Sequence, residues 1–502
     1  MKKYTLLLLL IFWTFIFWNG CKETISGEFS ENQPPTTNLT VERINRGNDF
    51  RLSSQIQISW FGSDPDGFIS GFEYAINDTS EGNFSFTTKT DSVFILPITP
   101  GQQTDDVLFK VRAVDDKGLA DPVGASLIYP VVNSDPEVSI NSNQSPPDTL
   151  FSVSSFGWNF SDPDGLLNIV RTEVAVNDTV NGWVEIPFTE DDDGQLFISL
   201  EVDNSSSGQK DAQVFLGKRY STIQIGGEIL TIPVEVGARN TFYVRAVDAA
   251  ESVSEVDSLS WYIKEQTSNT LFLNDIGGPS SLNKQNEHLA LLQSQGINPD
   301  VWIINDGQVE QDKVALSEAF PTVIDPTLIK TLSKWDHIYW ISDDIDRNIT
   351  YAQEILDEFF DNNGTAFVNI PMKSISREDP VFSFLPVDSI ATGQFYLFED
   401  SLVVPTEVSL SETLKVNSGS FALTNERPIK GVSGSTELYA AQFRRRRPNS
   451  SQAPYFGYKG VAIENAESNL IYFSLDITIL DGNNNLENLI NEIVIERLGF
   501  KQ

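Results

Sequence analysis

The chain has 502 residues, more than one ordinary domain holds, and its hydrophobic content of 40% is enough for several folded cores. Its formal net charge of −36 argues against a nucleic-acid partner, because nothing offsets repulsion from the phosphates. We therefore expect about three folded domains and no nucleic acid bound to them.

Residues 1–20 have the pattern of an export signal. Two lysines precede an apolar run that ends at Trp18, and this run is shorter than the roughly 18 to 20 residues that a spanning helix needs. The run is followed by Gly20 and Cys21, the only cysteine of the chain. This pair resembles the lipobox of bacterial lipoproteins, which implies that Cys21 is lipidated. The alternatives are a plain signal peptide and an anchor helix, each with an incidental cysteine.

Residues 21–36 are polar and end in Pro34-Pro35, which predicts a lipidated tether. The residues that start at Cys21, CKE, resemble the acidic export tags of some diderm bacteria. We therefore expect a cell-envelope protein, an outer membrane lipoprotein that is exposed at the cell surface. Its first partner would be the membrane, reached through the lipid on Cys21.

A duplicated unit follows the tether. The residues SDPDG occur at Ser63–Gly67 and again at Ser161–Gly165. Downstream, FKVRAVDDKG (109–118) in the first copy corresponds to FYVRAVDAAE (242–251) in the second. The order and the chemistry of both pairs match, so one module has been copied.

Short alternating stretches between turn residues predict that both copies are antiparallel β-sandwiches. Phe72 and Tyr74, for example, are each followed by a residue of the opposite face. The pattern FxVRAVDxxG resembles a strand of fibronectin type III and related immunoglobulin-like domains, which implies that Trp60 packs in the core. We expect all-β, immunoglobulin-like domains at residues 37–131 and 132–265.

The second copy carries about 35 residues more than the first, mostly between Pro187 and Gly237. Part of this insertion is the acidic stretch 190–194, which is typical of a solvated loop. A hairpin that turns at Gly226-Gly227 is predicted in the remainder.

The SDPDG segments have three interpretations. A tight turn that marks each module is favoured, because Pro fixes φ and Gly accepts positive φ. Alternatively, Asp64 with Asp66, and Asp162 with Asp164, would hold calcium through carboxylate oxygens. Catalysis is disfavoured, since the two carboxylates lie on one turn and do not face each other across a cleft.

Near Lys264 the pattern changes to strands that alternate with helices, which predicts an α/β domain whose parallel sheet is covered on both faces. Strands are expected within 269–278, 300–307, 336–344, 365–370 and 469–477, and helices within 283–296, 325–335, 349–364 and 486–500. This domain spans 266–502 and contains a β-rich insertion at about 371–468.

The pattern WDHIYWIS…ILDEFFDNNGTAFVNI resembles the class I glutamine amidotransferase-like superfamily, which implies a doubly wound, flavodoxin-like fold. Active members carry a cysteine after the third strand, paired with a histidine. Here Ser342-Asp343-Asp344 occupies that place, and the domain has no cysteine. His288 and His337, the only histidines, are expected to be structural. We therefore expect no amidotransferase activity and no catalytic residue of that kind.

Several predicted strands of this domain end in aspartates, namely Asp275, Asp306, Asp343 with Asp344, and Asp476. The carboxyl ends of parallel strands meet at one edge of a sheet, where ligands usually bind. Crowded carboxylates need a cation such as Ca²⁺ or Mg²⁺, a polar ligand or raised pKa values. The alternative, favoured most for Asp344 and Asp275, is that each carboxylate caps the helix that follows.

One basic cluster interrupts this acidic chain, at Arg444, Arg445, Arg446 and Arg447. Such a run is usually a solvated loop, and the alternative is contact with an anionic group of a lipid or glycan.

The leading hypothesis is a lipid-anchored surface protein with a non-catalytic binding or scaffolding role, whose partners are envelope proteins or glycans. One alternative is an envelope hydrolase that uses carboxylates at the carboxyl edge of the C-terminal sheet. The other is a structural subunit of a surface assembly. No cofactor is required, apart from Ca²⁺ or Mg²⁺ at the aspartate sites.

Overall fold

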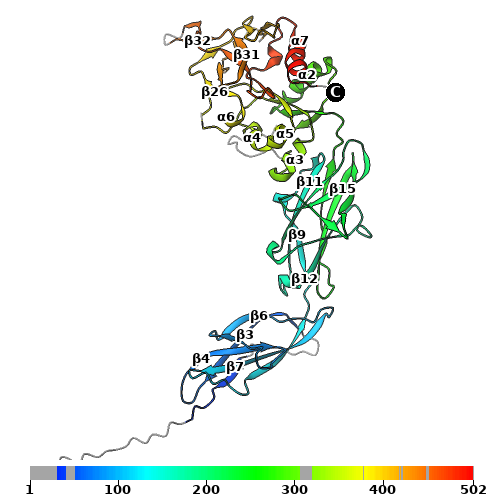
Figure 1. The fold of residues 1–502 in the computed structure, drawn as a ribbon, viewed down its shortest axis with the longest axis vertical. Coiled ribbons are helices and arrows are strands. Elements are labelled where there is room, and N and C mark those ends of the chain that lie inside the picture. The colour runs from blue at the N-terminus through cyan, green and yellow to red at the C-terminus, as the bar shows by residue number, and fades with distance from the viewer. Residues whose placement is uncertain are drawn as a thin grey trace, which may run out of the picture. The chain divides into compact units, whose positions relative to one another are not determined.

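The computed structural model describes residues 31–40, 51–305, 319–376, 378–417, 419, 422–424, 426–447 and 451–500. Cys21 and Asp306 lie outside these residues. The chain divides into two compact units, residues 1–133 and 134–502 (Figure 1). The second unit contains both the second module and the C-terminal domain, so these two are packed together.

Unit 1 is a sandwich of two sheets, which confirms the predicted β-sandwich. The three-stranded sheet has the order β1-β3-β6 and the five-stranded sheet the order β2-β8-β7-β4-β5. Their bounds are β1 (Thr36–Thr40), β2 (Leu52–Ser53), β3 (Gln55–Ser63), β4 (Ile69–Ile76), β5 (Ser85–Thr87), β6 (Asp91–Ile95), β7 (Thr104–Asp115) and β8 (Ala125–Val132).

The core of this module lies between the two sheets and centres on Trp60, as predicted. Trp60 is 2% exposed, and its ring lies about 6 Å from those of Phe72, Phe94 and Phe109. Alternate residues of β7, among them Phe109 and Val111, are fully buried. The period of two in the sequence is therefore the period of burial.

The second module repeats this plan with the sheets β10-β21-β20-β12-β13 and β16-β15-β14-β11-β9. Their bounds are β9 (Glu137–Ile140), β10 (Thr149–Leu150), β11 (Val153–Ser161), β12 (Ile169–Val176), β13 (Val184–Ile186), β14 (Gln195–Glu201), β15 (Gly208–Leu216), β16 (Ser221–Thr222), β20 (Arg239–Asp248) and β21 (Asp257–Ile263). The additional residues of this copy widen its second sheet, because β15 pairs with both β14 and β19 (Thr231–Val236). The predicted hairpin is present, with Gly226-Gly227 joining β17 (Gln224–Ile225) to β18 (Glu228–Ile229).

The C-terminal part is built on a single large sheet. Five strands pair in parallel in the order β23-β22-β24-β25-β35. Their bounds are β22 (Thr270–Asp275), β23 (Asp300–Ile303), β24 (His337–Ser342), β25 (Thr365–Asn369) and β35 (Leu470–Phe473). The strand that comes first in the chain is thus second in the sheet, and the order changes direction beside it.

Each face of this sheet has its own core, because neighbouring residues of a strand point to opposite faces. On β24, Tyr339 and Ile341 join the core that α2 and α7 cover, whereas Ile338 and Trp340 join the core that α3, α4 and α5 cover (Figure 1). The helices are α2 (Ser281–Ser294), α3 (Ile329–Leu332), α4 (Ala352–Ile355), α5 (Asp357–Asp361), α6 (Val381–Phe384) and α7 (Leu486–Ile490). Three of the long helices expected from the sequence are interrupted: 325–335 and 486–500 each contain a π-helical segment, and 349–364 is divided into a 3₁₀ turn, α4 and α5.

Part of the insertion at about 371–468 continues the same sheet, while β27 (Phe395–Tyr396), β32 (Arg444–Arg446) and β33 (Gln452–Pro454) form a three-stranded sheet of their own. Beyond β35 the strand order runs β34-β31-β28-β29, and these strands pair antiparallel. The bounds are β26 (Val387–Ile390), β27 (Phe395–Tyr396), β28 (Leu402–Pro405), β29 (Leu414–Lys415), β30 (Ile429–Gly431), β31 (Thr436–Ala441), β32 (Arg444–Arg446), β33 (Gln452–Pro454) and β34 (Gly460–Glu464). Among the described residues, none of the helices has the length and apolarity that crossing a membrane requires.

Candidate functional site

The side chain of the first aspartate in each SDPDG segment stabilises the turn in which it lies. In the first module the Oδ1 atom of Asp64 accepts a hydrogen bond from the Asp66 backbone N–H, at 3.2 Å. In the second module Asp162 accepts the N–H of Asp164 in the same way, at 2.7 Å. A carboxylate that binds the N–H two residues ahead is a common way to fix a turn.

The second aspartate of each segment holds the chain that enters the module. Asp66 accepts the backbone N–H of Gln33 at 3.3 Å, and Asp164 accepts the N–H of Ser134 at 2.6 Å. Gln33 and Ser134 are equivalent positions, each three residues before the first strand of its module. The repeated motif therefore joins a tight turn to the start of its sandwich.

The geometry offers little support for the calcium interpretation. Among the described residues, no group of three or more Asp, Glu, His or Cys side chains is arranged to hold a metal ion. The Asp162 carboxyl is buried, at 8% exposure, and burial raises its pKa to about 6, with the nearby carboxylates of Asp164 and Asp248 adding repulsion. Calcium binding at these turns stays a prediction for experiment.

The carboxyl edge of the parallel sheet brings Asp275 and Asp343 together around one arginine. The Nη1 group of Arg347 donates to the backbone carbonyl of Asp275 at 3.0 Å and also forms an ion pair with the Asp343 carboxylate. Asp343 also accepts the N–H of Gly277, at 3.2 Å. Internal contacts thus offset the repulsion that the sequence suggested for this edge.

Asp275 is the most buried carboxyl of this edge. Its side chain is fully buried, Oδ1 accepts a hydrogen bond from the Asn348 side-chain amide at 2.9 Å, and Oδ2 has no hydrogen-bond partner. Burial raises the pKa of Asp275 to about 7, although the Arg347 guanidinium opposes this shift. Burial therefore favours the protonated form of this carboxyl far more than at an exposed aspartate.

Asp344 forms an ion pair with a second basic residue. Its carboxylate lies 2.5 Å from the Nζ atom of Lys373, which also pairs with Asp346 at 2.7 Å. Burial opposes ionisation of Asp344, but its bonds to Lys373 and to the Asp346 N–H are stronger together and lower its pKa. Arg347 and Lys373, together with Lys284 on Asp476, are cations of this edge that sequence reasoning missed.

Fewer of these aspartates cap a helix than the sequence analysis expected. Asp275 accepts from a side-chain amide and Asp344 from a turn N–H, so neither caps a helix, which corrects the favoured interpretation of both. Asp476 does act as a cap, because its Oδ1 accepts the Thr478 N–H at 2.9 Å at the start of a 3₁₀ turn (Ile477–Ile479). Asp476 also pairs with Lys284, at 3.0 Å.

Both histidines have structural contacts, as expected. His288 is buried, its Nδ1 atom lies 2.9 Å from the Tyr339 hydroxyl, and burial lowers its pKa to about 4. His337 begins β24, at the opposite end from the carboxyl edge, and its ring stacks on Phe500. The Ser342 hydroxyl donates to the backbone carbonyls of Asp275 and Asp344 and is 3% exposed. No histidine lies in position to activate it.

The arginine cluster is a strand and not a loop, which corrects the favoured expectation. Arg444, Arg445 and Arg446 form β32, which pairs with β27 and β33 and is exposed. Arg445 donates to the Thr392 carbonyl at 3.1 Å, and Arg444 to the Gln452 carbonyl at 3.3 Å. The cluster therefore remains accessible to an anionic group, the second interpretation of this run.

The second module and the C-terminal domain share a core at Phe151. Its ring is 2% exposed, and its centroid lies 5.3 Å from that of Trp302 and 4.8 Å from that of Trp335. On the module side, Lys264 stacks over the same ring and donates to the Val301 carbonyl at 2.5 Å. An apolar plug of this kind fixes two domains against each other.

Asp300 ties the connecting segment into the same junction. Its carboxylate accepts the backbone N–H and the hydroxyl of Thr267, the N–H of Ser268, and the indole N–H of Trp335 at 3.0 Å. The buried Asp300 carboxylate thus binds Thr267 and Ser268, which lie in the segment after β21. This segment is therefore held in place and is not a flexible linker. Sequence reasoning missed this junction, since Phe151 lies in no motif.

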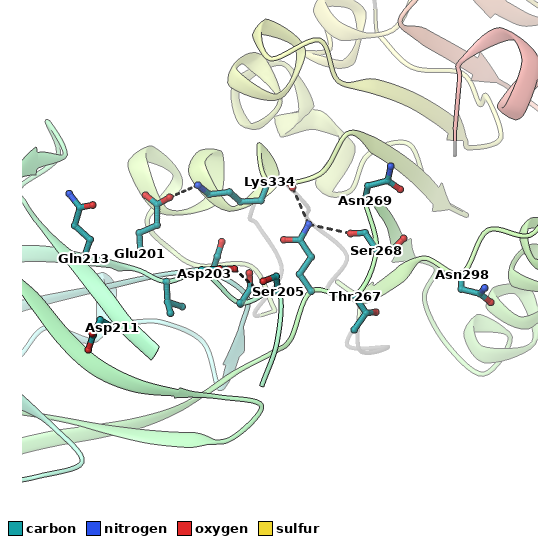
Figure 2. A pocket seen from close by; sticks show the side chains of 14 residues that line it. Glu201, Asp203, Ser205, Asp211, Gln213, Thr267, Ser268, Asn269, Asn298 and Lys334 are labelled. Carbon is teal, nitrogen blue, oxygen red and sulfur yellow. Dashed lines mark hydrogen bonds and ion pairs between the residues drawn. The ribbon is translucent and has the colours of Figure 1, made fainter. Parts of the chain in front are cut away.

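A polar cleft of about 1120 Å³ opens beside this junction (Figure 2). The residues that line it come from both domains: Ser152, Glu201, Val202, Asp203, Asn204, Ser205, Asp211, Gln213, Gln266, Thr267, Ser268, Asn269, Asn298 and Lys334. Figure 2 shows the ion pair of Glu201 with Lys334. The Gln266 amide donates to the carbonyls of Ser268 and Lys334. Those contacts shape the wall of the cleft.

No protein-family model and no curated protein matches this sequence. Solved structures with local likeness include the fibronectin(III)-like modules of Clostridium thermocellum CbhA, at 18% identity over 45% of this chain and 95% of that one, with a TM-score of 0.16. The D00-D0 domain of intimin covers 40% of this chain and 98% of its own at 10% identity and a TM-score of 0.13. The sialic acid binding region of a Streptococcus sanguinis adhesin covers 57% of this chain and 95% of its own at 12% identity and a TM-score of 0.13. The assignment of two β-sandwich modules therefore rests on their own strand order.

Proposed function

We propose that this protein is a lipid-anchored surface protein in which the second module and the C-terminal domain form one rigid, non-catalytic binding head. The lipid would be carried by Cys21. The tether and the first module would link this lipid to the head along the chain.

We assign the C-terminal domain to a flavodoxin-like, amidotransferase-like fold that has lost its chemistry. The parallel strand order β23-β22-β24-β25-β35, which is 2-1-3-4-5 in chain order, supports this assignment. The place of the nucleophile holds Ser342, whose hydroxyl is buried and bonded to two backbone carbonyls. A nucleophile needs a neighbouring base and access to substrate, and Ser342 has neither.

The observation that carries the binding role is the junction at Phe151. Two domains joined through a buried aromatic plug keep the walls of a cleft in fixed positions, and a preorganised site loses less entropy when it binds. The hydrolase alternative would need free carboxylates at the carboxyl edge, whereas Arg347 and Lys373 pair with those of Asp343 and Asp344.

Two measurements test this proposal. Cells grown with labelled palmitate should label the wild-type chain, and Cys21→Ser should abolish the label and release the protein from membranes or leave it unprocessed. The purified full chain should show no turnover of ester, glycoside or phosphoester substrates. An unlabelled wild-type chain would contradict the anchor, and turnover that Asp343→Asn abolishes would favour the hydrolase.

A further inference from the structure

The cleft between the second module and the C-terminal domain has a chemistry that selects its ligand. Nearly all of its lining side chains are hydroxyls, amides or charged groups, and Val202 is the apolar exception. Side-chain amides and hydroxyls both donate and accept hydrogen bonds, so they match a ligand rich in hydroxyl groups.

The charges of the cleft disfavour an anion. Lys334 is the one cationic side chain in the lining, and it is paired with Glu201, which also accepts a hydrogen bond from the Tyr220 hydroxyl at 2.7 Å. Asp203 and Asp211 add two further carboxylates. A phosphate or carboxylate in this cleft would therefore meet repulsion without a free cation to offset it.

Several polar groups of the cleft are not used within the protein. Among the described residues, the side-chain amides of Gln213 and Asn298 have no hydrogen-bond partner. The Ser152 hydroxyl, in a residue that is 3% exposed, also has none. The Ser152 Oγ atom has less than 1 Å² of accessible surface, so a ligand in the cleft would not reach it, and the groups free to meet a ligand are the two amides.

The unused groups are spread along the cleft. Figure 2 shows Gln213 and Asn298 at opposite sides of the view, with Ser268 between them. The cleft volume of about 1120 Å³ is larger than the roughly 300 to 1000 Å³ of common small-ligand pockets, which favours a chain of several units over one small molecule. No aromatic ring lines the cleft, so such a ligand would be held by hydrogen bonds and not by stacking.

We propose that this cleft binds a neutral oligosaccharide, with Gln213 and Asn298 as contacts at its two ends. This inference rests on the binding role proposed above and names its ligand class. Because hydrogen bonds replace equally good bonds to water, we expect dissociation constants on the order of 10 μM to 1 mM.

The test uses the purified full chain on an array of neutral linear glycans of three to six units, followed by titration calorimetry with the best of them. Asn298→Ala and Gln213→Ala should each weaken binding at least tenfold and leave the melting temperature unchanged. Gln224→Ala is the matched control, because Gln224 is exposed on β17 outside the cleft, and it should bind as the wild type does.

Three results would overturn the inference: no neutral glycan is retained, both cleft variants bind as the wild type, or galacturonate trimers bind more tightly than neutral ones in a way that depends on Asn298. The second result would leave the proposed binding role intact and place the site elsewhere. Turnover of a glycan would contradict the proposed non-catalytic function instead, so the two failures can be told apart.

Discussion

Phe151→Ala should loosen the junction between the second module and the C-terminal domain. Burying a phenylalanine side chain is worth about 2 to 3 kcal/mol, and an unfilled cavity adds to the loss. The cavity cannot close easily, because Trp335 is held by Asp300 and Trp302 packs on Phe320 at 5.0 Å. We therefore expect a loss of about 4 kcal/mol in the free energy of unfolding of residues 134–502.

Urea unfolding of the full chain measures this loss, and hydrogen exchange locates it. Exchange should accelerate in β23, on the C-terminal side of the junction, as well as around Phe151 itself. Phe156→Ala is the matched control, since Phe156 is equally buried but stacks on Phe242 inside the second module, at 4.2 Å. The reasoning fails if Phe151→Ala costs less than about 1 kcal/mol or leaves exchange in β23 unchanged.

Three further predictions concern the carboxylates. Asp164→Ala should lower the free energy of unfolding by about 1 kcal/mol and accelerate exchange of the Ser134 amide, which loses its acceptor; an unchanged Ser134 exchange rate would contradict the bond. Asp275 has a raised pKa in the folded state, so the free energy of unfolding should fall between about pH 4 and pH 7 and stay low above it. Asp275→Asn removes this loss, so its free energy of unfolding relative to the wild type should be about 4 kcal/mol higher at pH 8 than at pH 4, from about 3 pKa units at about 1.36 kcal/mol each; equal differences at both pH values would rule this out. Mg²⁺ should not raise the melting temperature, because Arg347 already pairs with Asp343; a rise that Asp343→Asn removes would restore the cation site at the carboxyl edge.

The modules were predictable because their sequence pattern is local. Alternating residues set the faces of β7, and the family resemblance placed Trp60 in the core, where it is buried. The Gly226-Gly227 turn was predictable for the same reason, since both glycines adopt positive φ, which other residues rarely do.

The contacts between domains were not predictable in this way. Phe151 lies at the end of a short strand, and its partners Trp302 and Trp335 follow more than a hundred residues later. Nothing local distinguishes an aromatic that plugs a junction from one that fills its own core. The cleft beside this junction was not predictable either, because one of its walls belongs to the second module and the other to the C-terminal domain.

The sequence pattern located the aspartates of the carboxyl edge, but it did not locate the basic residues that pair with them. Strand ends in the sequence located Asp275 and Asp343 correctly at a common place, since both contact Arg347. The neutralising role of Arg347 and Lys373 depends on loop conformations after the strands, which the strand pattern does not encode. Repulsion inferred from carboxylates alone was therefore overestimated.

Binding without turnover is the central claim, and the most direct test is the mass of a ligand captured by the protein. The full chain is purified from its own envelope under mild conditions, and any retained ligand is analysed by mass spectrometry before and after prolonged incubation with the protein. The account predicts a ligand whose mass does not change and whose retention falls in Asn298→Ala. A ligand that is shortened, or that gains the mass of water during incubation, would contradict it.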